Sequence, residues 1–212
     1  MYKTLVVDSS WNKTELCGIA EKYAADKGPF SRGSVNGGHR KGYTAVYEMF
    51  MNTYRTKPIN FCELGVYTGD SIRMFQDYFK DVEYYALDFN PDYIQHCKDQ
   101  NLPRTHYSLV NVKNMEQLQE TFKKIDTQFD IILDDSSHEI PDQYNIIQAA
   151  TPYLKPGGLL IIEDLERNWP ENIYQPIQGF IDENFSFESF IICHHNNRYC
   201  SDNDKIWVGT KK

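Results

Sequence analysis

Apolar and polar positions alternate in short blocks along most of this chain, and the blocks predict seven strands. Each block is rich in β-branched, aromatic and aliphatic residues and is bounded by polar or glycine-containing turns. The predicted strands span residues 59–65, 82–88, 104–110, 129–135, 158–164, 187–193 and 204–210. Apolar residues at helical spacing lie between the first five strands, near residues 70–80, 91–100, 114–125 and 141–154. Strands that alternate with helices in this way predict a parallel sheet with helices on both faces.

The last two predicted strands are joined differently from the others. Residues 194–203 form a short polar link that is too short to hold a crossover helix, so these two strands should pair antiparallel. The predicted fold class is therefore α/β, with a Rossmann-like, mostly parallel sheet of seven strands that includes one antiparallel strand.

The N-terminal part of the chain has a different pattern. Helical spacing over residues 14–25 and 43–54 flanks a glycine-rich stretch, residues 26–42, that is predicted to be a long loop. Such a loop is typical of a functional lid or of a locally mobile segment, and Lys27 and His39 are candidates to close over a ligand. We expect one domain over residues 1–212, with an N-terminal helical or lid segment (1–57) and a Rossmann-like core (58–212).

Composition and charge narrow the class of function. The chain has 212 residues, of which 41% are hydrophobic and 25% charged, as expected of a soluble globular protein. It has no apolar run long enough for a membrane span and no signal-peptide pattern, which predicts a cytoplasmic protein. Its five cysteines form no C-x-x-C pair, and its net charge of −8 disfavours a nucleic-acid partner. A small neutral substrate, or one bridged by a metal, fits better.

A glycine-containing turn follows the first predicted strand of the core. Gly65 and Gly69 allow the backbone to turn tightly at a helix N-terminus and to approach a ligand closely. The dinucleotide fingerprint G-x-G-x-x-G is absent, because Glu63 stands where that pattern has its first glycine. The pattern E-x-G-x-x-x-G instead resembles the first motif of class I S-adenosylmethionine (SAM) dependent methyltransferases. In that family the loop wraps the amino acid end of the cofactor, so the resemblance implies that Glu63, Gly65 and Gly69 bind SAM.

Asp88 ends the second predicted strand of the core. A carboxylate at this place can accept hydrogen bonds from a ribose diol, which supports a nucleoside cofactor without choosing between NAD and SAM. A helix cap ahead of Pro91 is the alternative role for Asp88.

Two further strands end in pairs of carboxylates. Asp134 and Asp135 end the strand over 129–135, and Glu163 and Asp164 end the strand over 158–164. If these strands are neighbours, their ends lie roughly 5 Å apart, and either protons or a cation must relieve the crowded charge. Oxygen ligands without a cysteine partner suit Mg²⁺ or a similar divalent cation. We expect Asp135, Glu163 and Asp164 as metal ligands and Asp134 nearer to the cofactor.

His138 lies three residues after Asp135, where the chain turns toward a helix. A histidine with a near-neutral pKa beside the predicted cation can act as a general base on a substrate hydroxyl. A lone histidine would more simply be a surface or capping residue, but the neighbouring carboxylates favour the catalytic role.

These motifs together resemble the metal-dependent sugar O-methyltransferases of the macrocin and mycinamicin type, a group that shares its signature with the cephalosporin hydroxylase-like proteins. The matching motifs are D-D-x-S-H, L-K-P-G-G and I-I-E-D-L, with a D-K-G … Y-T-x-x-Y-E lead-in that starts at Asp26. The resemblance covers most of residues 22–166. It implies Mg²⁺ on Asp135, Glu163 and Asp164, and His138 as the general base.

The predicted function is a SAM-dependent, Mg²⁺-assisted O-methyltransferase that acts on a hydroxyl of a small, sugar-containing molecule with a vicinal diol. The predicted partners exclude nucleic acid and membrane, and assembly into a homo-oligomer remains an open alternative. Two other functions also stay open from the sequence: an NAD(P)-binding oxidoreductase or sugar-modifying enzyme, and a non-catalytic SAM-binding protein.

Overall fold

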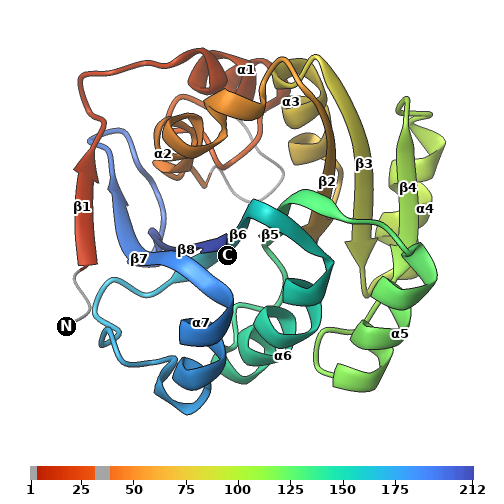
Figure 1. Cartoon of the computed structure of the whole chain (residues 1–212). Helices are drawn as coiled ribbons and strands as arrows, with labels where there is room; N and C mark the ends of the chain where they lie inside the picture. Colours follow the sequence, from red (N-terminus) through yellow and green to blue (C-terminus); the bar gives the residue numbers. More distant parts are fainter. Residues whose placement is uncertain (1–3, 32–38) are drawn as a thin grey trace.

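The computed structural model describes residues 4–31 and 39–212, and an eight-stranded sheet runs through this part of the chain (Figure 1). Its strands follow the spatial order β1-β7-β8-β6-β5-β2-β3-β4. Their bounds are β1 (Thr4–Asp8), β2 (Pro58–Leu64), β3 (Asp81–Asp88), β4 (Thr105–Leu109), β5 (Phe129–Asp134), β6 (Leu154–Leu165), β7 (Phe185–His194) and β8 (Lys205–Lys211). All seven predicted strands are present, and β8 is antiparallel to both of its neighbours while the other pairs are parallel. The predicted fold class is confirmed.

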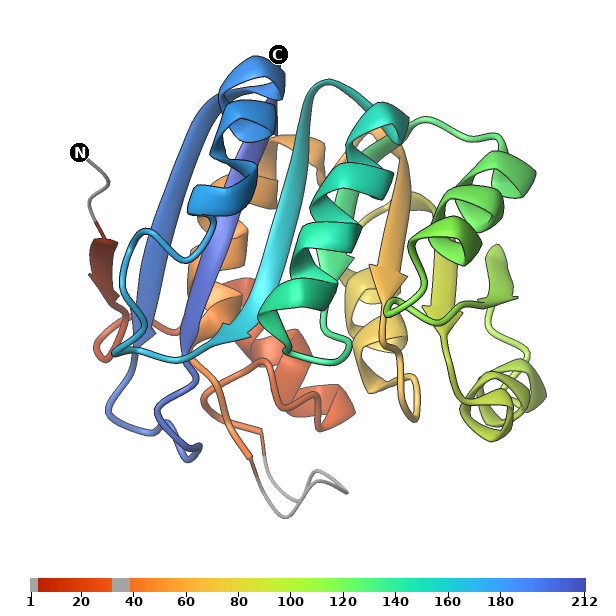
Figure 2. The same ribbon diagram turned by 90° about the horizontal axis from the view of Figure 1, so that it is seen from below.

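Helices cover both faces of the sheet, as Figure 1 shows, and Figure 2 views the face that carries α5, α6 and α7. The opposite face carries α1, α2 and α3. The helices are α1 (Glu15–Tyr23), α2 (Tyr43–Met51), α3 (Asp70–Tyr78), α4 (Pro91–Asp99), α5 (Met115–Ile125), α6 (Ile140–Ala150) and α7 (Gln178–Asn184), with short 3-10 turns at Asn52–Tyr54, Thr151–Tyr153 and Gln175–Ile177. Thr14 caps α1 by accepting a hydrogen bond from the Cys17 amide, as its position predicts.

Two features of the fold differ from the predicted pattern. β1 adds an eighth strand beside β7, and it escaped prediction because most of its side chains are exposed and show no alternation. The strand predicted over 158–164 is part of a longer β6 that begins at Leu154, where the pairing with β5 is irregular and Gly157 has φ of +77°. Residues 32–38 of the predicted loop lie outside the described residues.

The period of two along the strands decides which strand ends meet. On β5, Ile131 and Leu133 pack into the core beneath α1, α2 and α3, whereas Ile132 packs into the core beneath α5, α6 and α7. Glu63 pairs in register with Leu133, which itself pairs with Ile161 on β6. Glu63 and Asp135 therefore point toward the side of the sheet that carries α1, α2 and α3. Within residues 4–31 and 39–212, no helix is long and apolar enough to cross a membrane.

Candidate active site

A cavity of about 780 Å³ opens at the carboxyl ends of the central strands. This is where open α/β sheets bind their ligands, and the volume is ordinary for a small-molecule site. The predicted site residues that line it are Gly65, Asp88, Asp135, His138 and Asp164. The lining of this cavity therefore includes both the glycine turn after β2 and the polar residues at the ends of β5 and β6.

The glycine turn needs glycine for two physical reasons. Gly65 and Gly69 have φ of +87° and +83°, a region that side chains disfavour. A Cβ on Gly65 would also collide with the carbonyl oxygen of Asp135, so the turn after β2 packs directly on the turn after β5. Gly69 precedes α3 and is not among the residues that line the cavity.

Asp88 supports the glycine turn from the end of β3. Its Oδ2 accepts hydrogen bonds from the amides of Val66 and Tyr67 at 2.9 and 3.2 Å, and its Oδ1 accepts one from Asn90 at 2.9 Å. A carboxylate offers about four acceptor directions, so capacity for a ligand hydroxyl remains. Asp88 thus fixes the turn and still lines the cavity.

Glu63 lies beneath the glycine turn and is fully buried, so it does not line the cavity. Its Oε2 accepts hydrogen bonds from Ser71 Oγ, in the first turn of α3, and from the Tyr84 hydroxyl. Burial raises the pKa of Glu63 to about 7, although nearby Lys27 opposes this shift. Glu63 was predicted to bind the cofactor, but its contacts in the structure hold the start of α3 in place.

Asp134, which we expect nearer to the cofactor, is buried at the end of β5. Side chains alternate along a strand, so Asp134 points to the same side of β5 as Ile132, the side that carries α5, α6 and α7. It is 1% exposed and does not line the cavity. Its Oδ1 accepts hydrogen bonds from the amide and hydroxyl of Ser136 at 3.2 and 2.5 Å. Burial raises the pKa of Asp134 to about 7. The structure therefore gives Asp134 a role in shaping the turn after β5.

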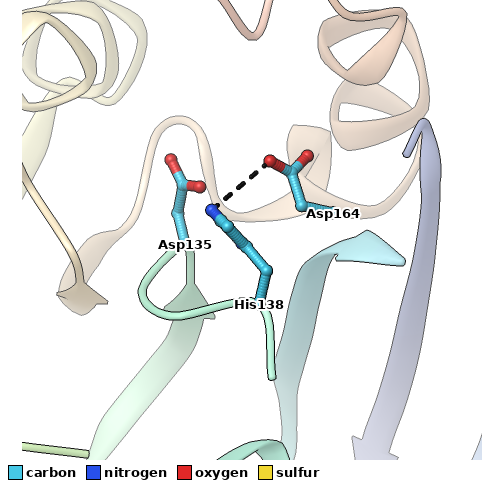
Figure 3. A group of neighbouring side chains, drawn as sticks. All are labelled: Asp135, His138 and Asp164. Atoms are coloured by element: carbon cyan, nitrogen blue, oxygen red, sulfur yellow. Dashed lines mark ion pairs between the residues drawn. The ribbon is translucent and has the colours of Figure 1, made fainter. Parts of the chain in front are cut away.

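Asp135, His138 and Asp164 form one group at the wall of the cavity (Figure 3). One ligand atom from each lies within 4.8 Å of the others. The His138 ring points between the two carboxylates, with Nε2 at 3.6 Å from Asp164 Oδ2. His138 and Asp164 both have left-handed backbone, with φ of +60° and +59°. Such conformations cost energy and cluster at functional sites, where neighbouring structure enforces them.

Asp164 is oriented by two groups from the N-terminal part of the chain. Lys41 Nζ lies 2.8 Å from Asp164 Oδ1, and the Tyr43 hydroxyl donates a hydrogen bond to the same oxygen at 2.5 Å. Burial alone would raise the pKa of Asp164, but Lys41, His138 and the hydrogen bond from Tyr43 hold that pKa below its usual value. Asp164 is thus an ionised carboxylate whose Oδ2 faces His138.

Glu163 does not line the cavity. Both of its oxygens lie 2.9 Å from Lys27 Nζ, and the Tyr47 hydroxyl donates to Oε1. Burial raises its pKa well above the usual value, and Lys27 opposes this shift. Glu163 shares Lys27 with Asp135, whereas Asp135 and Asp164 form a group with His138. Glu163 and Asp164 both accept hydrogen bonds from tyrosines of α2, because β6 is irregular between Ile162 and Leu165 and Asp164 has left-handed backbone.

Asp135 stands between these two environments. Lys27 Nζ lies 2.5 Å from its Oδ2, while the side chain keeps 26% exposure and lines the cavity. Burial raises the pKa of Asp135, and Lys27 and His138 oppose the shift. Asp135 and Asp164 offer the hard oxygen donors that Mg²⁺ prefers, so this pair of carboxylates beside the His138 imidazole fits a divalent cation.

Three side chains that contact the acids of the site had no role assigned from the sequence: Lys41, Tyr43 and Tyr47. The same is true of the backbone carbonyl of Asn203, which accepts hydrogen bonds from Lys41 and Tyr43. The signal that could have found the first three is the Y-T-x-x-Y-E lead-in. Trp169 and Tyr174, two aromatic residues that follow β6, pack against the core and do not line the cavity.

Residues 62–165 match a family model described as a methyltransferase domain. Together with the Rossmann-like sheet, this match makes the central part of the chain similar to methyltransferase domains. The chain is 29% identical over 163 residues to the 8-demethyl-8-alpha-L-rhamnosyl tetracenomycin-C 2'-O-methyltransferase of Streptomyces olivaceus, covering 73% of this chain and 39% of that protein. It is 25% identical over 142 residues to the mycinamicin VI 2''-O-methyltransferase of Micromonospora griseorubida, covering 60% of this chain and 33% of that protein.

A solved structure supports the same fold. The MycE methyltransferase of the mycinamycin pathway, crystallised in complex with Mg and SAH (S-adenosylhomocysteine), aligns with a TM-score of 0.68 and 22% identity. The alignment covers 94% of this chain and 55% of MycE. The predicted resemblance to the macrocin and mycinamicin type is confirmed, and these comparisons give no support to a nicotinamide-dependent oxidoreductase. The chain spans between a third and two fifths of the length of these curated relatives.

Proposed function

We propose that this chain is a SAM-dependent O-methyltransferase that uses Mg²⁺ or a similar divalent cation and methylates a hydroxyl of a sugar-containing small molecule. The observation that carries the proposal is a single cavity whose wall holds both Gly65 and Asp88 and the Asp135, His138 and Asp164 group. The first pair suits a nucleoside cofactor, and the group of three suits activation of a hydroxyl.

The relatives support the choice of acceptor. Two are named as methyltransferases of rhamnosyl tetracenomycin-C, and another acts on mycinamicin VI. MycE has been crystallised with Mg, SAH and mycinamycin VI. We propose a sugar with a vicinal diol as the acceptor class here, because two adjacent hydroxyls can approach one cation together.

Asp135 and Asp164 would hold the cation, and Asp88 and the turn around Gly65 would hold SAM. When bound, the cation supplies positive charge that lowers the pKa of a neighbouring hydroxyl, and SAM supplies the methyl group. His138 would accept the proton of the substrate hydroxyl at Nε2, the nitrogen that faces Asp164. The acceptor oxygen then gains a methyl group as its proton leaves, and the sulfur keeps the electron pair of the broken bond.

Glu163 serves in this proposal as the anchor of Lys27 and not as a third ligand. A Glu163→Gln variant tests that assignment, because a lost ligand would weaken Mn²⁺ binding as strongly as Asp164→Asn does. We expect instead a lower melting temperature and nearly unchanged Mn²⁺ affinity. Equal losses of Mn²⁺ affinity in both variants would restore Glu163 to the ligand set.

The decisive experiment is to incubate the protein with SAM, Mg²⁺ and a panel of glycosides and to measure S-adenosylhomocysteine. Each diol glycoside is paired with its monodeoxy analogue, so that the diol requirement is read directly. We expect product only with Mg²⁺ present and a diol acceptor. Calorimetry with S-adenosylhomocysteine and with NADH runs in parallel. Binding of NADH and not of S-adenosylhomocysteine would refute the proposal.

We further propose that the residues of this chain act as one domain in the cytoplasm on a small molecule and not on nucleic acid. The net charge of −8 and the five free thiols support this setting. Cell fractionation, and a gel-shift assay with RNA and DNA at low salt, test the two parts separately.

A further inference from the structure

One edge of the sheet is formed by β1, which pairs with β7 and has no strand on its other side in the described part of the chain (Figure 1). An edge strand leaves backbone N–H and C=O groups unpaired, and proteins often protect such an edge with charged residues. The other edge strand, β4, carries mostly polar side chains, and its His106 contacts Glu83 of β3 at 3.0 Å. The sequence of β1, TLVVD, instead has three consecutive aliphatic residues. β1 is therefore the less protected edge.

Large apolar side chains are exposed around β1. They are between 42% and 94% exposed and comprise Leu5 and Val6 of β1, Trp11 after β1, Met49 of α2 and Phe187 of β7. Val7 and Met49 line one small hollow, so β1 and α2 are neighbours on this side of the sheet. Exposed side chains of this size present on the order of 700 Å² together, close to the ~800 Å² that each partner contributes to a standard protein–protein interface. An exposed apolar area of this extent is typical of an interaction site.

The backbone hydrogen bonds of β1 show which of its groups face outward. The Ser9 amide, directly after β1, donates to a carbonyl of β7 at 3.0 Å. Because backbone groups alternate in direction along a strand, Thr4, Val6 and Asp8 direct theirs away from β7. The Thr4 amide accordingly donates to Glu171 Oε1, at 2.6 Å, and not to β7. Val6 therefore lies at the centre of the outward-facing backbone.

A second copy of the chain is complementary to this edge about a two-fold axis. If two β1 strands pair antiparallel with Val6 opposite Val6, the amide of each Val6 donates to the carbonyl of the other. Thr4 of each copy then lies opposite Asp8 of the other, so that a hydroxyl faces a carboxylate. Leu5 lies opposite Val7 in the same register. An axis at Asp8 would instead place two carboxylates opposite each other, which is destabilising. This complementarity needs only the residues of this chain, which favours a second copy as the occupant.

The same axis covers apolar side chains on both faces of the sheet. Leu5 pairs with Ile191, which lies in the core beneath α1, α2 and α3, so Leu5 is on that side and Val6 is on the other. A two-fold axis perpendicular to the sheet places each side of one copy beside the same side of the other. Leu5 and Met49 are therefore brought toward their equivalents on one face, and Val6 is brought toward its equivalent on the opposite face.

We propose that two copies of this chain associate through β1, antiparallel and centred on Val6, so that the two sheets become one. No residue of β1 is among the described residues that line the active-site cavity. The inference is therefore independent of the proposed function, and each copy keeps its own cavity.

The first test removes a backbone donor that only this pairing uses. Val6→Pro deletes the outward amide of Val6, and an edge strand tolerates proline where the nitrogen faces solvent. Leu109→Pro is the matched control, because Leu109 is exposed at the end of β4 and its amide also faces outward, since the next amide, that of Val110, donates to β3. Sedimentation velocity at several concentrations measures the dissociation constant of the dimer. We expect a dimer of the wild type and of Leu109→Pro, and a dissociation constant at least about tenfold higher for Val6→Pro, because two hydrogen bonds at the axis are lost.

The second test locates the axis. In a hydrogen-bonded antiparallel pair the two Cα atoms lie about 5.5 Å apart, within the range that a disulfide spans. Under mild oxidation Val6→Cys should form a disulfide-linked dimer on a non-reducing gel. Leu109→Cys, which has the same five native cysteines, should stay monomeric on that gel.

Each outcome decides the matter. A wild type that stays monomeric at every concentration overturns the inference, and so does a dimer that Val6→Pro leaves as tight as before. Equal cross-linking of the two cysteine variants also overturns it. If Val6→Pro lacks the circular dichroism spectrum of the wild type, Val6→Cys decides alone: a disulfide-linked dimer supports the pairing, and its absence refutes it.

Discussion

His138 and Asp164 face each other across the cavity wall, with Nε2 of the imidazole 3.6 Å from Oδ2 of the carboxylate. Both residues hold left-handed backbone. If His138 is the base, His138→Asn should lower turnover by about 10²- to 10⁴-fold, because a general base contributes that much. Asparagine tolerates left-handed backbone, so the fold should persist. Mn²⁺ affinity measured by calorimetry should fall much less than turnover, because Asp135 and Asp164 remain to hold the cation. A large loss of Mn²⁺ affinity would make His138 a ligand and not a base.

The Tyr43 hydroxyl orients Asp164 from behind the site. Tyr43→Phe should weaken divalent cation binding by about 10- to 100-fold, as removal of a group that orients a ligand does. Tyr54→Phe is the control, since the Tyr54 hydroxyl donates to the Gly157 carbonyl outside the cavity. Mn²⁺ titration of both variants checks the prediction, and equal affinities would show that Asp164 keeps its orientation without the hydroxyl.

Asp88 both fixes the glycine turn and lines the cavity. Asp88→Ala should weaken binding of S-adenosylhomocysteine by at least about tenfold, because it removes charge-assisted hydrogen bonds. Mn²⁺ binding should persist, since Asp88 is not part of the Asp135, His138 and Asp164 group. Calorimetry with each ligand in turn makes the comparison. Loss of both ligands together would indicate a general collapse of the cavity.

The close approach of Gly65 to the Asp135 carbonyl makes this glycine irreplaceable. Gly65→Ala should lower the free energy of unfolding by about 2–4 kcal/mol, because it adds both left-handed strain and a steric clash. Gly18→Ala is the matched control, because Gly18 lies within α1 and a Cβ there meets nothing within 4 Å. We expect that substitution to stabilise the protein by about 0.5–1 kcal/mol. Urea unfolding measures both, and a neutral Gly65→Ala would contradict the assigned geometry.

The buried carboxyl of Asp134 should make the free energy of unfolding depend on pH. Burial raises its pKa from 3.8 to about 7, so folding favours the protonated carboxyl. Its contribution to stability is complete below about pH 4 and is lost as pH rises through 7, by up to about 4 kcal/mol. Asp134→Asn keeps an acceptor for Ser136 and removes the titration, so it should flatten the decline in stability between pH 5 and 8. Urea unfolding in chelator measures the slope, with exposed Asp99→Asn as the control. An unchanged slope in Asp134→Asn would refute the shift.

Strand periodicity allowed most of the fold to be predicted from the sequence, because buried and exposed positions along a strand are occupied by apolar and polar residues in turn. The same periodicity separates Asp134 from Asp135, whose side chains point to opposite faces of the sheet. It does not separate Glu163 from Asp164, because β6 is irregular between Ile162 and Leu165 and both acids accept hydrogen bonds from tyrosines of α2.

The partners of the acids could not be predicted in the same way. Lys27 contacts Asp135 across 108 positions of the chain, and Lys41 contacts Asp164 across 123. Local sequence carries no signal for such pairs, since they depend on how α1 and α2 pack on the sheet. The D-K-G and Y-T-x-x-Y-E motifs and the glycine-rich stretch over 26–42 indicated that this region matters, but not which acids it contacts.

The segment matched by the family model, residues 62–165, contains the acids of the site but neither of their lysines. A chimera that grafted this segment onto the N-terminal helices of a relative would inherit the negative charges without the groups that neutralise them. Compatible donors are therefore those that carry a lysine at both matching places. Any such chimera must therefore include the segment that contains Lys27 and Lys41 together with the acids that they contact.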